Sequence, residues 1–119
     1  MIENHGGMSS DPKWLATLME RVQASNFGTL PDFGNFPDDI EYYDAVRQLL
    51  PYALGISVKS KMIDDKMLFS PEKMIRMVHE FGYRGFYGIE SSPTATGTAD
   101  DWEAVRFLQK ALKTTLNLS

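Results

Sequence analysis

Hydrophobic positions along this chain follow two periodicities that alternate from the N-terminus to the C-terminus. Short apolar runs typical of β-strands are each followed by a loop and then by a longer stretch with apolar residues three or four positions apart, which is typical of amphipathic helices. The predicted strands are residues 1–5, 27–32, 53–59 and 84–90. Strands that alternate with helices predict an α/β fold with a parallel sheet and right-handed connections.

Most of the helical stretches carry signals for their start or their end. Pro12 suits the first turn of a helix, and Pro51 ends the second helix. Ser70 caps the third helix, and Gly82 stops it. The charged run 64–66 is expected to be a solvated loop. The predicted helices run over 12–22, from about 39 to 50, over 71–81 and from about 100 to 116.

The predicted strands differ in the character of their two faces. Alternation places Phe86, Gly88 and Glu90 on one side of the fourth strand, with Tyr87 and Ile89 on the other. The third strand repeats this pattern, with Gly55, Ser57 and Lys59 opposite Ile56 and Val58. A doubly wound sheet buries both faces under helices and favours apolar residues on both. The asymmetry therefore favours part of a barrel, with helices on the outer face only and strands in the order 1-2-3-4.

Polar groups stand where the predicted strands end. They are Glu3, Asp32, Ser57 with Lys59, and Glu90. Successive ends are 29, 25 and 33 residues apart, close to the ~30 residues of a strand, helix and return. The carboxyl ends of parallel strands share one rim, where α/β proteins bind ligands. Three carboxylates and a lysine on this rim indicate a metal-assisted sugar site.

Four short segments in the same order carry a resemblance to a known family. They are Glu3-Asn4-His5-Gly6-Gly7, Leu30-Pro31-Asp32-Phe33-Gly34-Asn35, Ser57-Val58-Lys59 and Gly88-Ile89-Glu90. With them the chain resembles the C-terminal half of a sugar phosphate isomerase/epimerase of the xylose isomerase-like TIM-barrel superfamily. The resemblance covers residues 1–119 and matches them to the fifth through eighth βα units, half of a (β/α)8 barrel.

The resemblance implies roles for particular residues. Relatives hold one divalent metal, often manganese, with Glu, Asp, His and Glu on four successive strands. The resemblance assigns metal binding to Glu3, Asp32 and Glu90, and the acid–base roles to the two glutamates. Ser57 stands where the family has histidine, so a donor set of oxygens favours Mn²⁺ or Mg²⁺ over Zn²⁺. Lys59 is an alternative electrostatic partner for the carboxylates if no metal binds.

Substrate contacts are expected from the remaining polar residues of the rim. The resemblance assigns a small-molecule sugar to His5, Asn35, Ser57 and Lys59. Isomerisation or epimerisation next to a carbonyl moves a proton between carbons through an enediolate. Two carboxylates on opposite sides of a substrate can act as base and acid, and a divalent cation stabilises the charge that develops.

Composition excludes several classes of protein. The chain has 119 residues, a net charge of −4 and no cysteine, which argues against nucleic-acid binding and excludes disulfides and thiolate metal sites. No apolar run approaches the ~18 residues of a membrane span. A signal peptide is not evident at residues 1–7, so a cytoplasmic location is expected.

Other classes of function stay open at this point. A non-catalytic half-barrel that assembles with another chain is the main alternative, because four βα units leave two strand edges unpaired. Self-association or pairing with a missing N-terminal half-barrel is therefore expected, with little activity from this chain alone. An endonuclease IV-like phosphodiesterase is disfavoured by the presence of only two histidines. A flavodoxin-like receiver is disfavoured because Ser57 and Lys59, not an aspartate, end the third strand.

Overall fold

Four short parallel strands follow one another in chain order. In a computed structural model of the whole chain, residues 1–119, β1 (Ile2–Glu3) pairs with β2 (Thr29–Leu30), and β3 (Ile56–Val58) pairs with β6 (Tyr87–Ile89). Parallel bridges from Thr29 to Ala53 and from Asp32 to Ser57 connect the two pairs. The order is therefore β1-β2-β3-β6. Each strand is shorter than predicted, and the predicted continuous sheet consists of two small pairs joined by bridges.

A helix follows each parallel strand in the chain, and the bounds of these helices are close to the predicted ones. They are α1 (Pro12–Val22), α2 (Tyr42–Leu49), α3 (Pro71–Phe81) and α5 (Asp101–Leu116). All four begin at a side-chain cap in the preceding residue, as when the Ser70 hydroxyl accepts the N–H of Lys73. The second helix starts later than expected, because Glu41 and not a residue near 39 caps its first turn.

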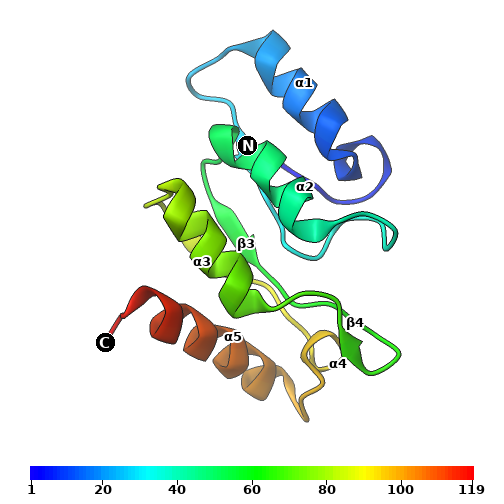
Figure 1. Cartoon of the computed structure of the whole chain (residues 1–119), viewed down its shortest axis with the longest axis vertical. Helices are drawn as coiled ribbons and strands as arrows, with labels where there is room; N and C mark the ends of the chain where they lie inside the picture. Colours follow the sequence, from blue (N-terminus) through cyan, green and yellow to red (C-terminus); the bar gives the residue numbers. More distant parts are fainter.

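The molecule has one layer of helices and one layer of strands. In Figure 1, α2 and α3 lie in front of the strands. The principal extents are 43 × 33 × 20 Å, and the shortest matches two layers about 10 Å thick. Ile56 and Val58 are buried against the helices, whereas Phe86 on the opposite face of the strands is 88% exposed. The predicted asymmetry of the strands is therefore present in this mixed α/β fold.

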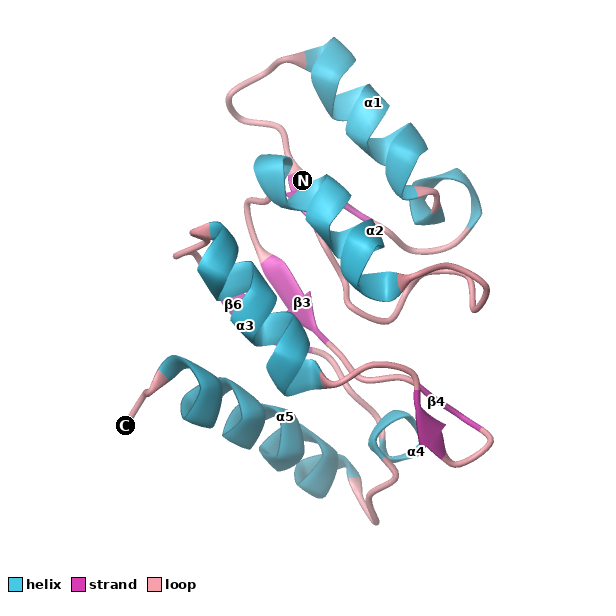
Figure 2. Cartoon of the chain, viewed as in Figure 1, coloured by secondary structure: helices cyan, strands magenta, loops and turns pink.

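Two small elements occur where the sequence predicted only loops. Residues 64–66 lie in a hairpin, with β4 (Met62–Ile63) antiparallel to β5 (Lys66–Met67). Asp64 and Asp65 both have positive φ, the conformation of a two-residue hairpin turn. A short helix, α4 (Pro93–Thr96), lies beside β4 (Figure 2). The chain also has 3-10 turns η1 (Gly7–Ser10) and η2 (Leu50–Tyr52).

Some large apolar residues of the helices stay at the surface. Leu15 and Met19 of α1 are buried, but the neighbouring Trp14 is 39% exposed. Trp102 at the start of α5 is 73% exposed. Each helix thus contributes a narrow apolar stripe to the core. None of the helices is long and apolar enough to cross a lipid bilayer.

Candidate functional site

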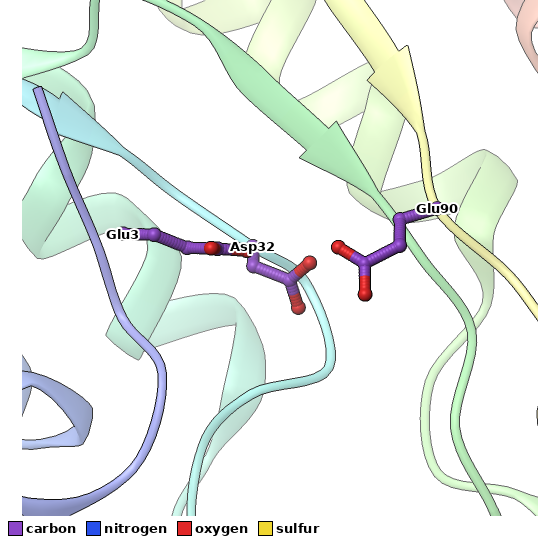
Figure 3. Close-up of side chains that lie close together, drawn as sticks. All are labelled: Glu3, Asp32 and Glu90. Atoms are coloured by element: carbon purple, nitrogen blue, oxygen red, sulfur yellow. The ribbon is translucent and has the colours of Figure 1, made fainter.

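Three carboxylates from three strand ends meet at one rim of the fold. Glu3 is the last residue of β1, Asp32 follows β2, and Glu90 follows β6. One oxygen of each lies within 4.8 Å of the corresponding oxygens of the other two. Figure 3 shows Asp32 and Glu90 pointing toward each other, with Glu3 beside Asp32. The structure therefore brings together the three residues that the sequence assigned to metal binding.

Asp32 is the most firmly held of the three. Its side chain has no exposed surface. Oδ1 accepts the Gly34 N–H at 2.8 Å, and Oδ2 accepts the Ser57 hydroxyl at 2.6 Å. Burial raises the pKa of Asp32, while these two hydrogen bonds oppose that rise by stabilising the charged form. The carboxylate has one rigid position, which suits a ligand more than a group that exchanges protons.

Asn4 fixes the position of Asp32 through its backbone. The Asn4 side chain is fully buried, donates Nδ2–H to the Asp32 carbonyl at 2.9 Å and accepts the Asp32 N–H at Oδ1 at 2.8 Å. These two side-chain hydrogen bonds replace the backbone hydrogen bonds that β1 and β2 would form if their pairing continued. No role for Asn4 was predicted from the sequence, because its contact with Asp32 spans 28 residues.

Lys59 lies between the carboxylates of two strands. Its Nζ donates to Glu90 Oε1 at 2.9 Å and lies 3.4 Å from Asp32 Oδ2. Partial burial opposes the charged form of Lys59, but the hydrogen bond to Glu90 and the charge of Asp32 outweigh it and raise the pKa. A Cβ at Gly34 would come within 2.9 Å of Lys59 Cδ, so the glycine leaves room for the lysine stem. Lys59 therefore stays charged beside the carboxylates.

Glu3 and Glu90 have looser surroundings than Asp32. Glu3 Oε1 accepts the Asn35 side-chain amide at 3.4 Å, a long hydrogen bond. Partial burial and the nearby charges of Asp32 and Glu90 raise the pKa of Glu3. The Glu90 side chain is 59% exposed and its ion-pair partner is Lys59. These two glutamates can move, and one of them holds a proton more readily than a free glutamate does.

An open pocket of about 720 Å³ adjoins the carboxylates. Of the residues predicted to contact substrate, His5, Asn35 and Lys59 line it together with Glu90. Ser57 is buried and does not line this pocket, because its hydroxyl is directed to Asp32. Lys61, directly before β4, also lines the pocket and was not predicted from the sequence.

No protein-family model matches this sequence, and no curated protein matches it.

Proposed function

We propose that the chain is half of a metal-assisted sugar isomerase or epimerase barrel, with its site at the rim formed by Glu3, Asp32 and Glu90. The observation that carries the proposal is the convergence of these carboxylates from three strands, with oxygens within 4.8 Å of one another. The parallel strand order β1-β2-β3-β6 and the helices on one side support half of a (β/α)8 barrel.

The donor set fits a hard divalent cation. Carboxylate oxygens suit Mn²⁺ and Mg²⁺, and the cluster has no imidazole or thiolate to favour Zn²⁺. One oxygen of each carboxylate lies within 4.8 Å of those of the other two, so Glu3, Asp32 and Glu90 would be the residues that hold such a cation. When all groups are ionised, three carboxylates and the Lys59 ammonium leave two negative charges, which one divalent cation neutralises.

The residues suit proton transfer between neighbouring carbons of a sugar. A bound cation would supply stabilisation of the negative charge that develops on the substrate oxygens. Glu90 would take the proton from the carbon beside the carbonyl. The electron pair of that C–H bond would form the C=C bond of the enediolate, and the π pair of the carbonyl would move to its oxygen. Glu3, whose pKa is raised, would return a proton to the neighbouring carbon or to the opposite face. Asp32 would act as a ligand only.

The strand layer supports the proposal that the barrel is incomplete. Phe86 and Met1 are exposed on the side away from the helices, and β1 and β6 each have one unpaired edge. Exposed apolar surface and open parallel edges favour association with further strands. A second copy of this chain, or a segment equivalent to the first four βα units, would provide them. We therefore expect little isomerase activity from these residues alone.

A second candidate function is a non-catalytic half-barrel in which Lys59 replaces the metal. Its Nζ contacts both Asp32 and Glu90, so the ammonium already offsets part of their charge. In that case the cluster serves to align strand ends, and a divalent cation adds nothing. The two candidates differ in whether Mn²⁺ binds.

Calorimetric titration with Mn²⁺ tests the proposal. We expect weak, saturable binding to the wild type and a loss of about tenfold in affinity for Glu90→Gln, because the amide removes one anionic ligand. Glu80→Gln, at an exposed position of α3, is the matched control and should bind as the wild type does. Equal affinities for the two variants would remove Glu90 from the site. No binding to the wild type would favour the second candidate.

A further inference from the structure

We infer that the pocket beside the carboxylates selects an uncharged sugar and rejects its phosphate ester, because neither lysine on its walls has a free N–H to offer an anion. The inference rests on the proposed function for the identity of the ligand as a sugar. It concerns the charge of that sugar, which the carboxylate cluster alone does not specify.

The ammonium of Lys61 has acceptors for all three of its N–H groups. Nζ lies 2.6 Å from Asp38 Oδ1 and donates to the Phe36 carbonyl and the Tyr42 hydroxyl, each at 3.1 Å. An ammonium has three donors and no acceptor, so this set is complete. Burial works against the charge of Lys61, but the hydrogen bonds to Asp38 and Tyr42 raise its pKa. Lys61 is thus charged and fully engaged.

The ammonium of Lys59 is engaged in the same way. Its three neighbours are Glu90 Oε1 at 2.9 Å, Asn35 Oδ1 at 3.1 Å and Asp32 Oδ2 at 3.4 Å. Phosphate would have to displace one of these acceptors from each lysine in order to bind. It would also come to lie beside the carboxylates that contact the lysines, whose like charge repels it.

The charge of the pocket stays unfavourable to phosphate even when a cation is present. Lys61 and Asp38 cancel each other. The cluster of Glu3, Asp32, Glu90 and Lys59 carries two net negative charges, which a divalent cation would only neutralise. Binding of phosphate generally requires an excess of positive charge or free donors, as in arginine clusters and helix N-termini.

The rest of the lining suits the hydroxyl groups of a neutral sugar. Only two of its sixteen lining residues are hydrophobic. The His5 imidazole and the second N–H of the Asn35 amide offer hydrogen-bonding groups to a ligand. Ser91 also lines the pocket, and its Oγ has no hydrogen-bond partner in the protein, so rotation of this side chain would offer a hydroxyl to a ligand.

The test compares a free sugar with its phosphate ester on the full chain. D-Fructose, D-fructose 6-phosphate and inorganic phosphate serve as probes, with amide chemical shifts of the pocket residues as the readout, without and with Mg²⁺. Asp38→Asn removes the carboxylate that neutralises Lys61, and Asp39→Asn changes the net charge equally at an exposed neighbour that does not line the pocket.

We expect the wild type to bind D-fructose at least as tightly as the ester and to show no shifts with inorganic phosphate. Asp38→Asn should bind the ester about fivefold more tightly than the wild type, and Asp39→Asn should not. Tighter binding of the ester by the wild type would overturn the inference. So would the lack of a gain in Asp38→Asn over Asp39→Asn, including the case in which the wild type binds neither sugar.

These outcomes are separate from those of the proposed function. A chain that binds no Mn²⁺ but prefers the free sugar would contradict the metal site and leave this inference intact. A chain that binds Mn²⁺ and prefers the phosphate ester would contradict only this inference.

Discussion

The ends of β2 and β6 present the same chemical group in opposite environments. Asp32 is fully buried and holds hydrogen bonds from Ser57 and Gly34, and its backbone is clamped by Asn4. Glu90 has a 59% exposed side chain whose ion-pair partner is Lys59. Strand β2 has a neighbouring strand on each side, whereas β6 lies at an edge and pairs only with β3.

This difference gives the carboxylates of one cluster different roles. A carboxylate fixed by three neighbouring segments supplies a constant position, at the cost of burying charge. A carboxylate at an open edge can rotate toward a cation or a substrate. The comparison predicts that changes around Asp32 affect stability, that changes around Glu90 affect binding, and that Lys59 links the two.

The largest effect is expected from breaking the clamp at the Asp32 end. Asn4→Ala leaves the buried Asp32 N–H and carbonyl without the partners that Asn4 supplies, so the free energy of unfolding should fall by about 2–4 kcal/mol. Asn35→Ala is the matched change at the more open side, where Asn35 is only partly buried, and should cost below about 1 kcal/mol. Urea denaturation of both variants measures the difference. Equal losses would show that the two ends are held alike.

An intermediate effect is expected from removing the link between the two ends. Lys59→Met removes the ammonium that contacts both Asp32 and Glu90. Mn²⁺ then no longer competes with an ammonium for the three carboxylates. We expect about tenfold tighter Mn²⁺ binding by calorimetry and lower stability in metal-free buffer. Lys66→Met in the exposed hairpin is the control. If Mn²⁺ binds less tightly to Lys59→Met, the lysine supports the metal site and does not compete with it.

The contrast between the two ends also shows what the sequence can predict. The sequence predicted α3 closely, because Ser70, Pro71 and Gly82 are local signals that act within one turn of the chain. It also predicted that Glu3, Asp32 and Glu90 share a rim, since the ends of consecutive parallel strands meet there. The first prediction depends on local capping signals, and the second depends on the spacing of the strand ends.

The parts that the sequence did not predict depend on contacts between distant segments. Asn4 bonds to Asp32 across 28 residues, and no local pattern distinguishes that clamp from a solvated side chain. Ser57 turns toward Asp32 because a buried carboxylate needs a donor, a requirement that appears only when β2 and β3 are adjacent. The hairpin turn at Asp64 and Asp65 was overlooked, although two residues that tolerate positive φ between short apolar segments indicate one.

The smallest effect is expected at Glu3, which lies between the two extremes in burial. Its pKa in the folded protein is raised, so the folded state binds a proton more readily than the unfolded chain does. As the pH rises through the range between the two pKa values, the free energy of unfolding falls, and at pH 7 the ionised Glu3 is a net cost. Glu3→Gln removes that charge and keeps an oxygen to accept from Asn35.

In metal-free buffer at pH 7, Glu3→Gln should therefore be slightly more stable than the wild type. Below about pH 4 the difference should vanish, because Glu3 is then protonated in both states. Added Mn²⁺ should reverse the order at pH 7, since the wild type gains a ligand charge that the variant lacks. Urea denaturation at the two pH values, with and without Mn²⁺, measures all of these. A wild type that is more stable than the variant at pH 7 without metal would show that Lys59 already compensates Glu3, and that the cluster needs no cation.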